Sequence, residues 1–221
     1  LGIIAIIVSL SRGGFIGLVS ILIFIWLISP RKIYSLIIVS VCIIFVLNFS
    51  TKDYWSEMST ITDISSGTVN ERLQSWNAAW NMFLHNPLGV GGNNFQVRFP
   101  EYQPSGMSRN MWGRAAHSLW FTLLSELGII GVIIYLNLLF TNIKQLVKMK
   151  NATRKYIKIR GDLKYLHYFS LACLASIVGF LTSGTFLSVL YYPHYWYLTS
   201  FIVSANNIYE KSILLPTSEV R

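Results

Sequence analysis

Apolar residues gather in long runs along this chain, separated by short basic turns and by one long polar stretch. A helix needs roughly 20 mostly apolar residues to cross the hydrocarbon core of a bilayer, with a lower limit near 17. Several runs are close to that limit, so interfacial aromatic residues such as Trp26, Tyr34 and Tyr191 are expected to extend them. We predict about six membrane-spanning helices, because lipid offers no partners to unpaired backbone groups. The runs cover approximately residues 1–10, 14–29, 33–48, 119–142, 165–186 and 195–208.

Composition agrees with a membrane location. Of 221 residues, 53% are hydrophobic and 12% are charged, whereas about 25% of the residues of a soluble domain are charged. The fold class we predict is all-α, a polytopic integral membrane bundle of helices with one long external loop. The first run has neither a basic n-region nor a cleavage site. It is therefore expected to be the tail of a membrane helix, and the chain the C-terminal part of a longer protein.

The positions of Lys and Arg predict the orientation in the membrane. The net charge is +9, and basic residues gather in the segment 144–164, in the turn 30–32 and in the C-terminal tail. All three are expected on the cytoplasmic side. The basic segment 144–164 could also bind anionic lipid or nucleic acid. Its charge is better explained as a signal for membrane topology, and we expect no nucleic-acid partner. We therefore predict three regions: membrane helices in 1–48, an external loop in 49–118 and membrane helices in 119–221.

The external loop, roughly 70 residues long, is expected to carry structure of its own. Thr68 and Glu71 have the spacing of a capping box, with Thr68 as the N-cap. After them, apolar residues recur at helical spacing and predict an amphipathic helix over about 69–85. Pro87 and the glycines that follow should end it.

Two arginines in external positions are candidates for binding an anion. Arg12 follows a serine and precedes two glycines, which would let backbone approach a ligand; the alternative is an interfacial arginine that extends toward water. Arg72 is expected in the first turn of the predicted loop helix, where a cation opposes the helix dipole. It would either pair with Glu71 or Asp63 or recruit an anion. Two guanidinium groups suit a diphosphate, since each can donate two charge-assisted hydrogen bonds.

His117 stands where the polar loop meets the apolar run that begins at 119. An imidazole with an ordinary pKa near 6.5 can remove a proton from a hydroxyl group at neutral pH. We expect Arg12, Arg72 and His117 to converge on one pocket at the outer face. Glu126 lies nine positions later, about 180° around a helix, and is expected to be structural or to pair with another helix.

Other types of site have weaker support. The stretch Gly89-x-Gly91-Gly92 follows no predicted strand and lacks a Walker lysine, so it does not indicate a nucleotide site. No spacing typical of metal ligands occurs, so we predict no metal and no cofactor.

Several of these residues, in this order, resemble the O-antigen ligase and O-antigen polymerase superfamily. The motifs are Ser11-Arg12-Gly13, Glu71-Arg72 with Trp76, His85 to Gly91, Asn94-Phe95, and His117-Ser118 followed by Gly128-Ile-Ile-Gly131. The resemblance covers roughly residues 9–142. Members have about twice as many membrane helices, so the N-terminal half would lie outside this chain.

The resemblance implies a GT-C-like glycosyltransferase that takes a glycan from undecaprenyl diphosphate at the outer face of the bacterial cytoplasmic membrane. Arg12 and Arg72 would hold the diphosphate, and His117 would activate the hydroxyl of a lipid, saccharide or protein acceptor. Transfer would proceed with inversion and without a metal. Ser118 and Gly91 would support the site. Arg98, Arg109 and Arg114 are also external, and any of them could replace Arg72.

Three other readings stay open. A polymerase that joins repeat units of O-antigen or capsule would carry the same motifs as a ligase. A transporter would place charged or Gly/Pro-broken positions at mid-bilayer in paired helices, whereas only Glu126 is deep here. The chain could also be an inactive structural fragment.

Overall fold

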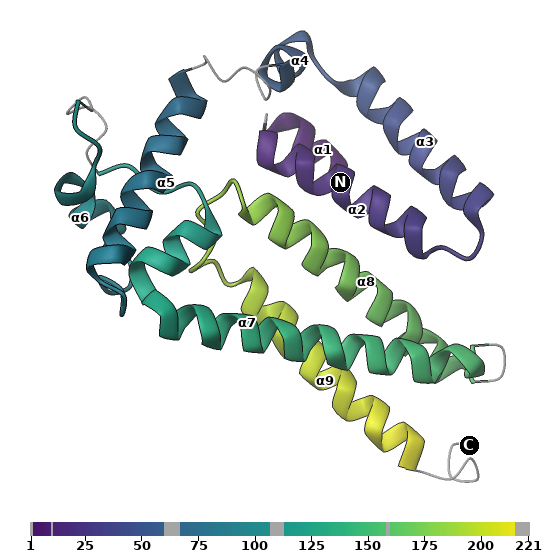
Figure 1. Ribbon diagram of the computed structural model, residues 1–221. Coiled ribbons are helices and arrows are strands. Elements are labelled where there is room, and N and C mark those ends of the chain that lie inside the picture. The colour runs from purple at the N-terminus through teal and green to yellow at the C-terminus, as the bar shows by residue number, and fades with distance from the viewer. Residues whose placement is uncertain (1, 10, 60–66, 107–112, 158–159, 215–221) are drawn as a thin grey trace. The chain divides into compact units, whose positions relative to one another are not determined.

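The computed structural model describes residues 2–9, 11–59, 67–106, 113–157 and 160–214. All regular secondary structure in these ranges is helical (Figure 1), which confirms the all-α prediction. The helices are α1 (Gly2–Val8), α2 (Arg12–Ile28), α3 (Lys32–Phe49), α4 (Lys52–Ser59), α5 (Gly67–His85), α6 (Phe95–Tyr102), α7 (Leu119–Thr153), α8 (Gly161–Gly184) and α9 (His194–Leu214), and a 3-10 turn at Arg154–Tyr156 follows α7.

Three helices are long and apolar enough to cross a membrane: α3, α7 with its 3-10 extension, and α8. The α2 helix is apolar but has 17 residues, and α1 has 7. The α9 helix has 21 residues, but polar and charged side chains such as Asn206, Glu210 and Lys211 occupy its second half. Length and composition therefore support three of the six predicted crossings within the described residues.

The chain forms two compact units, each built from two stretches of sequence. One contains Leu1–Ile133 and Val178–Tyr191, and the other contains Ile134–Ile177 and Tyr192–Arg221. In the second unit, the Asn142 amide donates to the Tyr195 hydroxyl (3.3 Å) and to Thr199 Oγ1 (2.9 Å). Polar contacts of this kind hold apolar helices together where the hydrophobic effect is weak. Every described candidate site residue lies in the first unit.

Small residues let α2 approach the end of α8. Gly13 and Gly17 are buried, and a Cβ atom on Gly17 would lie 2.0 Å from Ser183 Oγ. A Cβ atom on Gly13 would lie 3.2 Å from Leu187 Cγ. These glycines therefore serve helix packing. Gly13 faces Leu187 in this packing and also borders the cavity described below, so a role of its backbone in binding a ligand stays a prediction.

The α7 helix is broken at Gly128, whose φ of 60° and ψ of −163° are not helical. The segment 87–91 fills the break, so that its amide groups satisfy carbonyls that the helix cannot pair. A Cβ atom on Gly128 would lie 2.3 Å from the carbonyl carbon of Leu88, so only glycine fits there. The bonds run from Val90 N to Ser125 O (3.0 Å), from Gly91 N to Glu126 O (2.9 Å) and from Ile129 N to Pro87 O (2.9 Å).

Glu126 holds this region together through its buried carboxylate. The carboxylate accepts hydrogen bonds from the amides of Asn93 (2.8 Å) and Phe95 (2.9 Å) and from the Tyr191 hydroxyl. The role of Glu126 is thus structural, as the sequence suggested. His117 precedes α7, however, so the angle between His117 and Glu126 cannot be obtained by counting residues around this helix.

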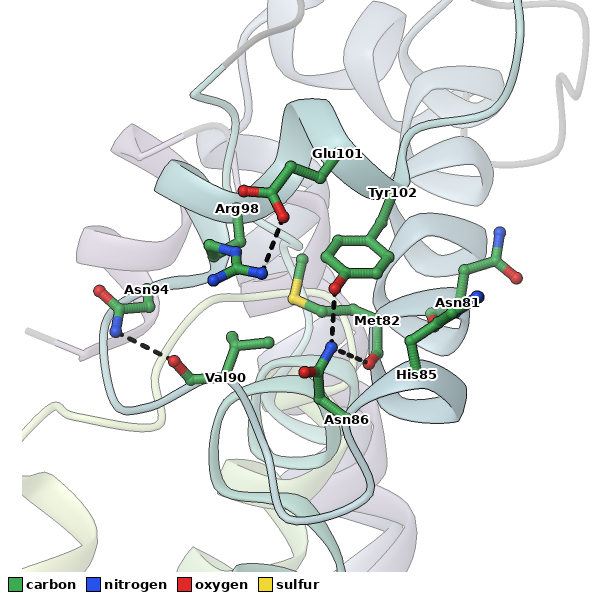
Figure 2. Close-up of polar contacts among 9 residues, drawn as sticks. All are labelled: Asn81, Met82, His85, Asn86, Val90, Asn94, Arg98, Glu101 and Tyr102. Atoms are coloured by element: carbon green, nitrogen blue, oxygen red, sulfur yellow. Dashed lines mark hydrogen bonds and ion pairs between the residues drawn. The ribbon is translucent and has the colours of Figure 1, made fainter.

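The α5 and α6 helices pack against each other around a core that includes Met82, Phe95 and Phe99. The Asn86 amide at the end of α5 donates to Met82 O (3.2 Å) and to the Tyr102 hydroxyl (2.8 Å) of α6 (Figure 2). The predicted loop helix over 69–85 corresponds to α5, which begins at Gly67. Thr68 therefore lies inside the helix and is not its N-cap.

Candidate active site

A cavity of about 260 Å³ brings the two candidate arginines together. Arg12 comes from the start of α2 and Arg72 from α5, and Trp76 and Phe186 supply aromatic walls. The residues around the cavity are Arg12, Gly13, Ile16, Val69, Arg72, Leu73, Trp76 and Phe186. Two cations in a largely apolar cavity form a place where an anion with an apolar attachment can bind.

Arg12 is the first residue of α2. Ser11 caps this helix, and its hydroxyl accepts a hydrogen bond from the Gly14 amide (3.1 Å). The N-terminus of a helix carries partial positive charge. The guanidinium group of Arg12 adds a full charge at this end, so the local field favours an anionic ligand.

Arg72 lies in the second turn of α5, since the helix begins at Gly67. The expectation of a first-turn position is therefore wrong by about one turn, and a cost from the helix dipole does not apply. Burial lowers the pKa of Arg72, and the nearby charges of Arg12 and Arg114 lower it further. The charges of three guanidinium groups thus act on one another, and negative charge nearby stabilises them.

Glu71 forms an ion pair with Arg114. Pairing of Arg72 with Glu71 was one alternative from the sequence, and in the structure the carboxylate of Glu71 goes to Arg114 instead. Asp63, the other predicted partner, lies outside the described residues. Arg114 therefore belongs to the same basic cluster as Arg72.

His117 lies in the irregular segment that leads into α7, with a backbone φ of +48°. Its side chain is half-buried. Burial lowers the pKa of the imidazole, and the charges of Arg72 and Arg114 act in the same direction. This lowering of the pKa favours the neutral imidazole. His117 does not line the cavity, so of the three residues expected to converge on one pocket the cavity contains Arg12 and Arg72.

The remaining predicted residues lie around this cluster or away from it. The hydroxyl of Ser118 caps α7 by accepting from the Phe121 amide (3.5 Å). Gly91 takes part in filling the break of α7. Arg98 pairs with Glu101 at 2.8 Å on the exposed surface of α6 (Figure 2) and does not line the cavity. Arg109 lies outside the described residues.

Sequence reasoning missed the segment 185–191, which contacts the start of α7. Ser188 Oγ accepts a hydrogen bond from the His117 amide (3.0 Å), and Thr185 Oγ1 accepts from the Trp120 indole (3.1 Å). Nothing in the local sequence signals these contacts, because they join positions 65 or more residues apart. Trp76 was noted as part of a motif, but its contact with the Ala116 carbonyl (2.9 Å) was not foreseen.

The described residues contain no group of three or more His, Cys, Asp or Glu side chains placed to hold a metal ion. The chemistry of the cluster is that of cations beside a neutral base. Such a set can bind a diphosphate and accept a proton from a hydroxyl group.

The basic cavity and the half-buried histidine of this all-helical chain suit an anionic ligand. A model of the O-antigen ligase family matches residues 1–136, and the chain belongs to this family. The family is one of membrane glycosyltransferases of the ligase and polymerase type, which use lipid-linked saccharides. No curated protein and no solved structure matches the chain.

Proposed function

We propose that the protein transfers a glycan from undecaprenyl diphosphate to an acceptor hydroxyl at the outer face of the bacterial cytoplasmic membrane. The observation that supports the proposal is the cavity shared by Arg12 and Arg72, together with the effect of the Arg72 charge on the pKa of His117. Membership of the O-antigen ligase family supports the same class of reaction.

The reaction divides between the cations and the base. Arg12 and Arg72 bind the diphosphate, and the acceptor oxygen attacks the anomeric carbon from the opposite side. The bond between that carbon and the diphosphate oxygen breaks, and the diphosphate leaves with the electron pair. His117 takes the proton of the hydroxyl group. The product has the inverted configuration.

Positive charge placed in advance makes the departure of the diphosphate easier. In this proposal guanidinium groups provide that charge, with Arg114 as a third cation, so no step needs a metal ion. The charges of Arg12 and Arg114 disfavour the cationic form of Arg72, and a bound diphosphate would act in the opposite direction.

The hydrogen bonds at the break in α7 disfavour the transporter alternative. A broken helix in a transporter leaves backbone groups that coordinate the transported ion. Here the carbonyls of Ser125 and Glu126 accept hydrogen bonds from Val90 and Gly91. These carbonyls are therefore already occupied by the segment that fills the break.

Two variants in the reconstituted full chain separate the two roles. His117→Ala should lower the rate of transfer by about 100- to 10,000-fold, the usual contribution of a general base, while binding of undecaprenyl diphosphate in vesicles stays unchanged. Arg12→Ala should weaken that binding by about 10- to 100-fold, the value of a lost charge-assisted bond.

Matched controls exist for both variants. His85→Ala removes an imidazole that is bonded to the Asn81 carbonyl at 2.8 Å, and Arg98→Ala removes a guanidinium group outside the cavity. Both should retain binding and transfer. A fully active His117→Ala enzyme would end the proposal.

A further inference from the structure

The peptide group between Ala116 and His117 is held at both ends. Its carbonyl accepts a hydrogen bond from Trp76 Nε1 at 2.9 Å, and its N–H donates to Ser188 Oγ at 3.0 Å. The two partners come from different parts of the chain, Trp76 from α5 and Ser188 from the segment that follows α8. Ala116 is buried, so water does not readily replace its bond with Trp76.

This arrangement controls the direction of the His117 side chain. The φ of +48° is in the left-handed region, which residues other than glycine rarely adopt. The direction of the Cα–Cβ bond is set by the plane of the preceding peptide group together with φ. Fixing both the carbonyl and the N–H holds that plane, so one of these two determinants is restrained.

The two partners also belong to the walls of the basic cavity. Trp76 lies one turn after Arg72 on the same face of α5, and its ring lines the cavity. Ser188 lies two residues after Phe186, which lines the cavity as well. The ring of Trp76 stacks on Phe121 of α7 with centroids 5.1 Å apart, so the indole has little freedom to turn. The α5 helix, which presents Arg72, therefore also holds the backbone of the histidine.

The segment 185–191 is anchored on both sides of Ser188. Thr185 Oγ1 accepts from Trp120 Nε1 at 3.1 Å, and the Tyr191 hydroxyl donates to Glu126. The three contacts recur every third residue along the segment. Each contact reaches a different residue at or near the first half of α7, namely Trp120, His117 or Glu126. This segment lies outside the matched residues 1–136.

We propose that Trp76 and Ser188 are positioning residues that together orient His117 for removal of the acceptor proton. The inference rests on the proposed role of His117. Neither residue needs to touch the substrate for this role, since each acts through the backbone of His117.

Hydrogen exchange in the full chain tests the contact itself. Ser188→Ala should speed deuterium uptake in the peptide 114–118 by about 5-fold or more, because the His117 amide loses its acceptor. Ser188→Thr keeps the hydroxyl and should restore slow uptake. Thr185→Val removes a similar hydrogen bond three residues away and should leave the uptake of 114–118 unchanged. Equal uptake in wild type and Ser188→Ala would overturn the inference.

Transfer kinetics test the consequence, with the lipid-linked saccharides extracted from the membranes of the source organism as the donor. Ser188→Ala and Trp76→Phe should lower kcat by about 10-fold or more and leave KM for the donor within about 2-fold. Trp76→Phe keeps the aromatic wall and loses only the N–H donor. The double variant should resemble either single variant, because both changes release the same peptide group.

The outcomes separate this inference from the proposed function. Wild-type kcat in both variants, together with an inactive His117→Ala enzyme, would refute the positioning role and leave the function in place. A fully active His117→Ala enzyme would instead refute the proposed function. An equal loss in Thr185→Val would mean that general loosening of the segment is responsible, which also refutes the specific role of Ser188.

Discussion

The imidazole of His117 lies beside two guanidinium groups, an unusual environment for a group that must accept a proton. Burial and the charges of Arg72 and Arg114 lower its pKa, so the side chain is neutral and ready to act as a base. A bound diphosphate brings negative charge to the same place and shifts the pKa upward. The base therefore becomes stronger when the donor is present, which couples proton removal to occupancy of the cavity.

We expect kcat/KM to rise with pH and to reach a plateau before neutrality. The sign follows from the base: only the neutral imidazole accepts a proton, and a lowered pKa extends the neutral form to lower pH. The midpoint should therefore lie below 6.5, the ordinary value. A pH profile of transfer between about 5 and 8 measures it.

Arg114→Gln should move that midpoint upward, because one of the cations that disfavour the imidazolium ion is removed. The variant also leaves the Glu71 carboxylate without its partner, and a negative charge nearby acts in the same direction. Arg98→Gln should leave the midpoint in place. A downward shift in Arg114→Gln would contradict the assignment of the titration to His117.

At the scale of elements, the site depends on places where helices begin, bend or end. The α2 helix presents Arg12 at its first residue, and α5 presents Arg72 and Trp76 on one face. The α7 helix starts just after His117 and breaks at Gly128, where the segment 87–91 enters. The break also positions Glu126, whose carboxylate holds Tyr191 and the start of α6. The segments 87–95 and 185–191 are thus both hydrogen-bonded to the first part of α7.

Gly128→Ala should destabilise the protein by more than about 2 kcal/mol. The backbone conformation is one that only glycine adopts readily, and the added methyl group would lie 2.4 Å from the Pro87 carbonyl oxygen. Thermal unfolding in detergent measures the effect. Gly161→Ala is the control, because a Cβ atom there would meet nothing within 4 Å. Equal stability of the two variants would contradict the close packing of the segment 87–91 against Gly128.

At the scale of the whole molecule, the contacts restrict the topology. His117 precedes α7 and Ser188 follows α8, and the two residues are hydrogen-bonded. Both must lie on one side of the membrane, so α7 and α8 together cross it an even number of times. Both helices qualify as membrane spans. If each helix crosses once, the basic segment between them is expected on the other side, in agreement with the positive-inside rule.

Labelling of single cysteines should confirm this orientation. In a chain with Cys42→Ala and Cys173→Ala, Ser105→Cys should react with a membrane-impermeant maleimide in intact cells, because the loop 49–118 is expected to be external. Lys155→Cys should react only after permeabilisation. Both positions are exposed, so failure to react reports the side of the membrane. The reverse pattern would invert the proposed topology and place the site in the cytoplasm.

Much of the fold was predictable because its cause is local. Apolar runs and the absence of water in a bilayer require helices, and the spacing of Leu73, Trp76 and Trp80 predicted α5 to within a few residues. The break at Gly128 was not predictable, because it depends on a contact with residues about 40 positions earlier. Three of the six predicted crossings meet the criterion of length and composition within the described residues, while the short α1 and the more polar α9 do not, and the count of six stays a prediction.

By itself, the sequence determined the helical membrane character, through its composition and apolar runs, and the family, through the order of its motifs. The roles of Arg12, Arg72 and His117 stay predictions from residue type. Only the tertiary structure decided that Arg12 and Arg72 share a cavity, that Glu71 pairs with Arg114, and that Ser188 and Trp76 hold the backbone of His117. The physical reason is distance along the chain. A hydrogen bond or a charge acts over a few ångströms in space, and residues far apart in sequence come that close only when the helices pack.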